Sequence, residues 1–435
     1  MISLEALESL EPFQARSIIE ELRKGSVPVE YVPVFTVGRQ KWLAYIADDL
    51  DNYIGQGGAK VRFISGDYGD GKTHFMSVVR HLALEKKFAV SFVVLTRDVP
   101  IHKFETVYQA IVRQIQGDFT GTGIRALLTE WLEKLEQTPG QGQGQEPDAG
   151  KAYQALAGHF KDMPGMDISF ANALAALVNN RFAPLAEGED KAHRDADKEI
   201  LMRWFEGGKV TKRELKPFQI YEFLNKANAR QFMNSLILFL RHTGHQGLIL
   251  LMDEMETVVA MSTSIRNAAY ENVRLFIDNS ETAQFLHIFF SIIPDVLVSE
   301  KGFKSYDALW SRVRSIGDEK RLNFRGVLVD LHQTPLQTEE LLDLGRTLRT
   351  LHGISFRWHP EEMVTDSVME QICAGQKRMG VISEVRLFVK QLISILDLAE
   401  QGTSPQDMDM ARHMVETRHE MEAEKVKQMQ PTWDS

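Results

Sequence analysis

The sequence has a single cysteine, Cys373, among 435 residues. One thiol excludes an internal disulfide, and it excludes zinc or iron–sulfur sites that are built from several cysteines. We interpret Cys373 as a small buried side chain in a reducing compartment. The first eleven residues also lack the basic segment of a secretory signal, since their only charged side chains are three glutamates.

Long hydrophobic runs and an excess of positive charge are missing as well. The longest apolar run, from His287 to Val298, is interrupted by Pro294 and Asp295, and it is shorter than the roughly 18 residues that a membrane-spanning helix needs. The 50 Lys and Arg residues are outnumbered by 60 Asp and Glu residues, for a net charge of −10. This balance excludes a chain that is basic overall but not a local basic face. We expect a soluble, cytoplasmic protein that does not bind membranes.

Short apolar runs alternate with stretches of helical periodicity. Hydrophobic residues make up 43% of the chain, which is ordinary for a folded protein. Apolar runs that are nearly continuous suit strands buried on both faces of a parallel sheet. The predicted strands are residues 61–65, 89–95, 248–252 and 287–293. Because predicted helices separate these strands, we expect an α/β fold with a parallel sheet.

The chain divides into a core and a helical C-terminal part. We expect residues 1–334 to form the core, interrupted by a mostly helical insert at about 117–240. Within that insert, residues 138–150 are rich in Gly, Gln and Pro, which predicts a flexible loop. The remaining residues, 335–435, have helical periodicity and are predicted to form a lid and a terminal helix.

A phosphate-binding motif follows the first predicted strand. It has the pattern G-x-x-x-x-G-K-[ST], in which glycines let backbone amides point at phosphates and the next helix directs its positive end at the same anion. Lys72 would supply charge to the β and γ phosphates, and the Thr73 hydroxyl would bind Mg²⁺. We therefore expect ATP and Mg²⁺ as cofactors. The predicted nucleotide-binding residues are Gly66, Asp67, Tyr68, Gly69, Asp70, Gly71, Lys72, Thr73 and His74.

Two acids follow the predicted strand 248–252 and match the Walker B pattern. Asp253 is predicted to hold Mg²⁺, and Glu254 is predicted to orient and deprotonate the attacking water. Acids at the carboxyl end of a parallel strand lie where open α/β sheets bind ligands. Together with the phosphate-binding motif, they predict ATP hydrolysis.

Four further residues are candidate ATP contacts, with plainer alternatives. Ser291 lies inside a predicted strand, where its hydroxyl would contact the γ-phosphate or position the water, or else bond to neighbouring backbone. Arg386 begins a predicted helix and would reach the phosphates as a second sensor. Gly38 and Arg39 precede another predicted helix, and they either wrap the adenine or simply begin that helix.

Basic residues suggest two kinds of contact with other molecules. Arg312 or Arg314 would act as an arginine finger in a neighbouring subunit's site, or would be solvated on the surface. The stretch from Lys209 to Lys216 and the run from Arg312 to Arg325 would contact nucleic-acid phosphates. Solvated helix faces are the alternative for both stretches.

The chain resembles the ATP-binding proteins of bacterial BREX phage-defence systems, the BrxD-like family. The resemblance rests on residues 23–28 (RKGSVP), 37–39 (VGR), 66–73 (GDYGDGKT) and 102–105 (HKFE). It covers most of the chain, roughly residues 4–396. These proteins are AAA+-type P-loop ATPases similar to origin-recognition ATPases, so an AAA+-like core with a helical lid is expected.

The resemblance also implies roles for the candidate residues. ATP would bind to residues 66–73, Asp253 and Glu254 would hydrolyse it, and Ser291 and Arg386 would act as sensors. It implies a homo-oligomer with a role in antiviral defence, on double-stranded DNA and beside a helicase or another defence protein. Three alternatives stay open: a nucleotide-gated switch with slow or no turnover, a DNA-loading clamp, and a regulatory ATPase outside defence.

Overall fold

A computed structural model describes residues 7, 9–137, 149–184, 190–278, 283–314, 322–381 and 383–429. Residues 138–148 of the predicted flexible loop lie outside this described part. The chain forms two compact units. The first comprises residues 1–45, 64–81 and 323–435, and the second comprises residues 46–63 and 82–322. None of the helices in the described part is long and apolar enough to cross a membrane.

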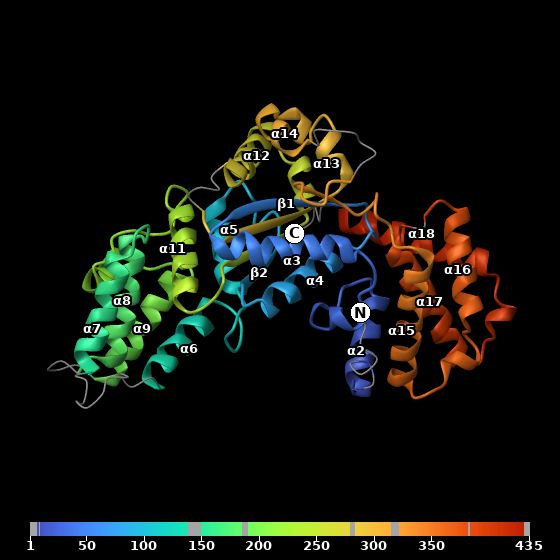
Figure 1. Cartoon of the computed structure of the whole chain (residues 1–435), viewed down its shortest axis with the longest axis horizontal. Helices are drawn as coiled ribbons and strands as arrows, with labels where there is room; N and C mark the ends of the chain where they lie inside the picture. The colour runs from blue at the N-terminus through green and yellow to red at the C-terminus, as the bar shows by residue number, and fades with distance from the viewer. Residues whose placement is uncertain are drawn as a thin grey trace. The chain divides into compact units, whose positions relative to one another are not determined.

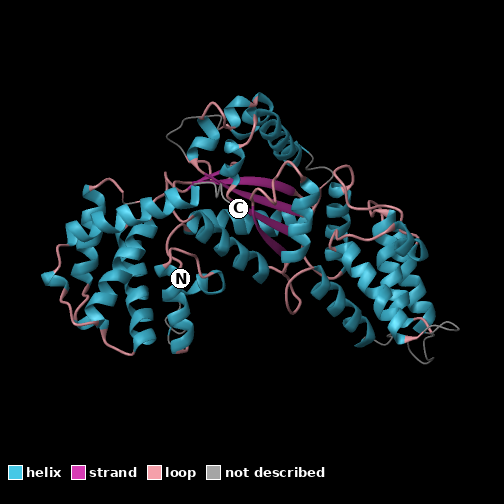
Figure 2. Ribbon diagram, turned by 180° about the vertical axis from the view of Figure 1, so that it is seen from behind, coloured by secondary structure: helices cyan, strands magenta, loops and turns pink. Residues whose placement is uncertain are grey.

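The strands are drawn in magenta in Figure 2. They form a five-stranded sheet with the order β2-β3-β4-β1-β5. The strands are β1 (Ala59–Ser65), β2 (Ala89–Val94), β3 (Leu248–Asp253), β4 (Leu286–Ile292) and β5 (Leu328–Asp330). Strands β2, β3 and β4 run parallel. All four predicted strands are present, and the α/β fold class with a parallel sheet is confirmed. The sequence pattern does not predict β5, because a three-residue strand is too short to show a periodicity.

Strands β3 and β4, in the interior of the sheet, are buried along their whole length. Their apolar sequences fit this position, since a strand covered on both faces has no solvent side to make polar. The parallel register pairs Leu248 with Leu286 and Met252 with Phe290. Continued by one step, the same register sets Asp253 opposite Ser291. The strand pairing therefore brings together two residues that lie far apart in the sequence.

Helices make up most of the second unit outside the strands. They are α5 (Phe104–Gln114), α6 (Ile124–Gln137), α7 (Ala149–Asp162), α8 (Ile168–Phe182), α9 (Lys191–Phe205), α10 (Lys212–Leu215), α11 (Ala229–His242), α12 (Thr263–Asp278), α13 (Pro294–Val298) and α14 (Asp307–Val313). Short 3-10 turns are η2 (Ile54–Gln56), η3 (Lys216–Phe218), η4 (Met255–Ala260) and η5 (Phe303–Ser305). Helices α7, α8 and α9 lie side by side within the stretch predicted as a helical insert (Figure 1).

The first unit joins the N-terminal helix to the C-terminal helices. These are α2 (Pro12–Arg23), α15 (Thr338–Phe356), α16 (Asp366–Arg378), α17 (Val385–Glu400) and α18 (Met410–Met429), with 3-10 turns η1 (Val29–Val34), η6 (Pro360–Glu362) and η7 (Pro405–Asp407). Helix α2 packs against α15 and α17 (Figure 1). Ile18 and Ile19 share a buried cluster with Leu348, and Arg23 donates two hydrogen bonds, of 3.0 and 2.7 Å, to Asp397.

Three segments connect the two units within continuous elements. Strand β1, helix α3 (Gln40–Asn52) and helix α4 (Lys72–Glu85) each have residues in both units. The phosphate-binding motif lies between β1 and α4, in the first unit. Asp253 and Glu254 lie at the end of β3, in the second unit.

A charged cluster is buried beside the sheet in the second unit. The Arg62 side chain has no exposed surface and donates to Asp49 Oδ2 at 2.5 Å, and Lys60 Nζ donates to the same oxygen at 2.7 Å. His287 of β4 is fully buried, and neither of its ring nitrogens has a hydrogen-bond partner within the described residues. Burial, together with the charges of Arg62 and Lys60, lowers the pKa of His287 well below its ordinary value. The imidazole therefore stays neutral in the folded protein.

Replacing His287 with Leu should reduce the loss of stability in acid. The folded-state pKa of His287 lies far below the unfolded value of about 6.5. As the pH falls below about 6.5, the unfolded chain therefore takes up a proton that the folded protein does not, and the free energy of unfolding decreases. For one such group, the free energy of unfolding falls by about 1.4 kcal/mol between about pH 7.5 and pH 5.5. Urea unfolding at both pH values should show this difference between wild type and His287→Leu. Identical pH dependence in the two proteins would show that His287 titrates normally.

Candidate functional site

The phosphate-binding loop joins β1 to α4 with two glycines in the left-handed region. Gly69 has a φ of 98° and Gly71 a φ of 86°, values that residues with a side chain adopt only with strain. Helix α4 begins at Lys72, immediately after the loop, and Thr73 lies in its first turn. The loop thus leads directly into a helix N-terminus, the arrangement in which free amides and the helix dipole bind anions.

The Lys72 side chain folds back over the loop. Its Nζ donates to the carbonyl oxygens of Gly66 at 2.9 Å and Asp67 at 3.1 Å, and it lies 5.1 Å from the centre of the Tyr68 ring. The side chain is only 8% exposed. A buried ammonium group is therefore held at the loop, where phosphate oxygens would provide stronger acceptors than neutral carbonyls.

Arg39 lies against this loop in the first unit. Its guanidinium donates to the Asp70 carbonyl at 2.5 Å, and Gly38 and Arg39 lie directly before helix α3. Burial lowers the pKa of Arg39 to about 10, while the charges of Asp70 and Glu340 act in the opposite direction. The side chain therefore carries its charge at neutral pH. Adenine contact by Gly38 and Arg39 stays a prediction.

His74, the second residue after Lys72, is uncharged. Its Nε2 lies 3.1 Å from Thr36 Oγ1, whose own proton is donated to the Val32 carbonyl at 2.7 Å. The Thr36 oxygen must therefore accept, which places the proton on Nε2 of His74. Burial and the neighbouring Arg39 lower the pKa of His74 to about 3. The first turn of α4 thus carries a neutral imidazole beside the predicted phosphate site.

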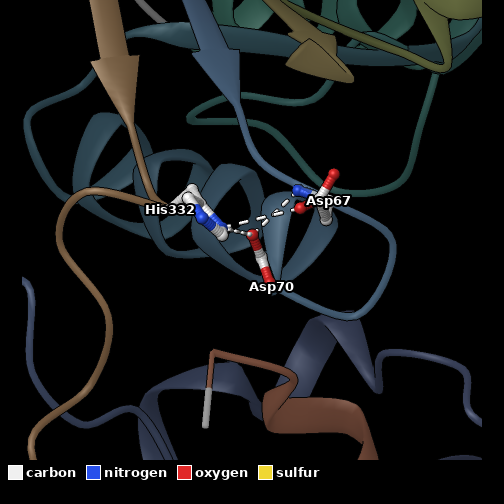
Figure 3. Close-up of side chains that lie close together, drawn as sticks. All are labelled: Asp67, Asp70 and His332. Atoms are coloured by element: carbon white, nitrogen blue, oxygen red, sulfur yellow. Dashed lines mark hydrogen bonds and ion pairs between the residues drawn. The ribbon is translucent and has the colours of Figure 1, made fainter. Parts of the chain in front are cut away.

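Two loop acids and a histidine gather at the loop (Figure 3). His332 Nδ1 lies 3.5 Å from Asp67 Oδ2 and 3.7 Å from Asp70 Oδ2, and Asp70 Oδ2 accepts a hydrogen bond from the Asp67 amide at 2.8 Å. Asp70 is fully buried, and this burial raises its pKa. The Asp70 carboxylate therefore fixes the turn of the loop. Sequence reasoning did not single out His332, which lies two residues after the end of the unpredicted strand β5.

Arg386 also reaches the loop. It lies in the first turn of α17, and its backbone N–H donates to the Gly69 carbonyl at 3.2 Å. The backbone of a residue more than three hundred positions away thereby contacts the predicted phosphate-binding loop. Whether its guanidinium binds phosphate stays a prediction.

The acids of the second unit form a hydrogen-bonded group with Ser291. The Ser291 hydroxyl is buried and donates to Asp253 Oδ1. The Glu254 amide donates to both Asp253 Oδ1 at 3.0 Å and Ser291 Oγ at 2.9 Å. The sequence suggested that the Ser291 hydroxyl contacts either the nucleotide or neighbouring backbone. The structure adds a third role, because this hydroxyl also bonds to Asp253, the predicted magnesium ligand.

Glu254 adopts an unusual backbone conformation. Its φ of 61° and ψ of 41° lie in the left-handed region, which costs a residue with a side chain about 1–2 kcal/mol. Glu254 is exposed although Asp253 is buried. Such strain at a strand end often accompanies function, and here it turns the chain sharply from β3 into η4.

The candidate arginine finger is paired within its own unit. Arg312 lies on α14, and its guanidinium donates to Asp278 and to the Ala308 carbonyl. Arg314 follows that helix and is exposed. Other residues of this basic run, 315–321, lie outside the described part. The finger role stays a prediction for both arginines.

Replacing Ser291 with Ala should destabilise the second unit. The change removes one donor from the buried Asp253 carboxylate and one acceptor from the Glu254 amide, which should lower the free energy of unfolding by about 1–3 kcal/mol. Urea unfolding measures this loss. Ser291→Thr, which keeps a hydroxyl, is the matched control and should recover most of the stability. An alanine variant as stable as wild type would contradict the importance of these bonds.

Comparisons with known proteins bear on this geometry. The comparison with curated proteins returned no match, and neither did the comparison with solved structures. A family model described as BREX system ATP-binding protein BrxC/D matches residues 10–418. This match includes the phosphate-binding loop, both acids at the end of β3 and helices α15, α16 and α17. The chain therefore belongs to the BrxC/D family of ATP-binding proteins of the BREX phage-defence system.

Proposed function

We propose that this chain is an AAA+-type ATPase that hydrolyses ATP as a homo-oligomer and acts on double-stranded DNA in BREX defence. The observation that carries the proposal is the conformation of residues 66–73, with Lys72 at the start of α4 and left-handed glycines in the loop. The family's description as ATP-binding proteins supports ATP as the nucleotide. A helicase or another defence protein is the proposed partner, and the cytoplasm is the proposed location.

The residues of the loop fit the phosphates of ATP. The β and γ phosphates would accept from the amides of the loop and of the first turn of α4. Lys72 Nζ, now bonded to two neutral carbonyls, would gain charged acceptors in exchange. Arg39 adds a second cation at the Asp70 carbonyl. This positive charge offsets the two loop acids, which would otherwise repel a phosphate.

Two oxygen-bearing side chains are suitable ligands for Mg²⁺. We assign its coordination to the Thr73 hydroxyl and the Asp253 carboxylate, since Mg²⁺ prefers oxygen ligands and retains several waters. Asp253 Oδ1 accepts from Ser291 and from the Glu254 amide, and these bonds hold the carboxylate in one orientation. When bound, the ion would neutralise charge on the β and γ oxygens.

Glu254 would prepare the water for hydrolysis. Its exposed carboxylate would orient the attacking water and take its proton. We assign charge stabilisation in the transition state to Lys72 and to an arginine of a neighbouring subunit. If Arg312 is that arginine, its bonds to Asp278 must first open. Arg386, at the start of α17, would connect the loop with the C-terminal helices.

Lys72→Ala should abolish ATP binding. The change removes the cation at the loop while leaving the glycines and the helix N-terminus in place. Isothermal titration with ATP and Mg²⁺ measures the loss, and circular dichroism confirms that the variant is folded. Full retention of ATP affinity in a folded variant would overturn the assignment of the loop.

Glu254→Gln should bind ATP normally and fail to hydrolyse it. The amide keeps the size of the side chain but cannot take a proton, so steady-state turnover should fall by about 10²–10⁴-fold. Phosphate release should be measured with and without DNA, next to ATP affinity. Turnover equal to wild type would show that Glu254 is not the base. Undetectable turnover in the wild type under every condition would favour the alternative of a nucleotide-gated switch.

A further inference from the structure

A short basic segment lies exposed on the second unit. It consists of Lys209, Lys212, Arg213 and Lys216, all with exposed side chains. Glu214 is the one acid among these eight residues. Its carboxylate is already engaged, because it accepts from the Thr211 amide at 2.7 Å and pairs with Arg203 at 3.3 Å. Four positive charges therefore cluster in a chain whose net charge is −10.

The basic segment is held firmly to the helices around it. A capping box between Thr211 and Glu214 begins α10, and the Arg203 pair ties α10 to α9. Leu215 is fully buried, and the Gln219 carbonyl after η3 accepts from Asn172 of α8 at 2.8 Å. Cations on a fixed backbone lose less entropy when they bind a partner than cations on a flexible tail.

A cleft of about 380 Å³ adjoins the basic segment. It begins at Pro217 and Phe218, directly after Lys216, and continues between α8 and α9. Two cations and several amides line it against one acid. The amides of Asn172 and Asn180 already donate to the carbonyls of Gln219 and Arg194, so the cations supply the main attraction for phosphate oxygens. Its polar lining includes Lys161, Asn179, Asn180, Arg194, Asp197 and Gln219.

We propose that the basic segment and this cleft bind the phosphodiester backbone of DNA. The inference rests on the DNA role in the proposed function and locates it on the helices of the second unit. Lysine and arginine heads together with side-chain amides contact phosphates but read no base sequence from this position. Binding should therefore depend steeply on salt and little on sequence, because each phosphate contact releases counterions.

The test uses the full chain and a fluorescent DNA of mixed sequence, as a duplex and as a single strand. Fluorescence anisotropy gives the affinity at several salt concentrations between about 50 and 200 mM. For the duplex, Lys212→Gln with Lys216→Gln should reduce the slope of log affinity against log salt by about 1.8, or about 0.9 for each lost contact. The loss of affinity should therefore be about tenfold larger at about 50 mM salt than at about 200 mM.

Lys301→Gln with Lys304→Gln is the matched control. Both lysines are exposed elsewhere on the second unit, so the double variant changes net charge equally and should leave the slope unchanged. Equal slopes for the two double variants, or no DNA binding by the wild type, would overturn the inference. A change confined to the duplex would support it, whereas a change confined to the single strand would contradict the duplex role on which it rests. ATP turnover without DNA should be the same in both double variants. If no turnover is detected in any of the proteins, the result counts against the proposed ATPase activity and not against the DNA-binding surface.

Discussion

Two hydrogen bonds from distant parts of the chain and one within the loop hold the phosphate-binding loop in place. Arg39 donates to the Asp70 carbonyl, the Asp70 carboxylate accepts from the Asp67 amide, and the Arg386 amide donates to the Gly69 carbonyl. A loop rich in glycine has many conformations available, so each fixed carbonyl or amide reduces the entropy that phosphate binding would cost. The conformation of the loop is thereby fixed by one contact within the motif and by two from outside it.

The same contacts give the loop a physical connection to the C-terminal helices. Arg386 lies in the first turn of α17, and α17 packs with α2 and α15 in one buried core. If a nucleotide binds one conformation of the loop more tightly than another, it would also favour the position of α17 that goes with that conformation. The size of this shift is set by the difference in affinity between the two conformations. Under the proposed function, this is the route by which ATP would act on the helical lid.

The acids show how burial divides roles among similar side chains. Asp70 and Asp253 are both buried and accept hydrogen bonds from neighbouring groups. Glu254 is exposed and lies in a strained backbone conformation. Buried, hydrogen-bonded carboxylates suit positioning, whereas an exposed acid can exchange protons with water. The geometry therefore supports Glu254, rather than Asp253, as the candidate base.

The strands and the phosphate-binding motif are local features, and the sequence alone was enough to predict them. A parallel strand that is buried on both faces must be apolar throughout, and a loop that wraps phosphates needs glycine, lysine and threonine at set spacings. The sequence also determined that Asp253 and Glu254 follow a buried strand. The family resemblance, likewise drawn from local motifs, is confirmed over residues 10–418.

Contacts between distant segments were decided only by the tertiary structure. His332 approaches Asp67 and Asp70 because the three-residue β5 places it there, and no periodicity reveals so short a strand. Ser291 meets Asp253 because of the register between β3 and β4, and register depends on pairing energies summed over whole strands. Likewise, α2 packs with helices from the other end of the chain, since apolar periodicity tells which face of a helix is buried but not which partner covers it.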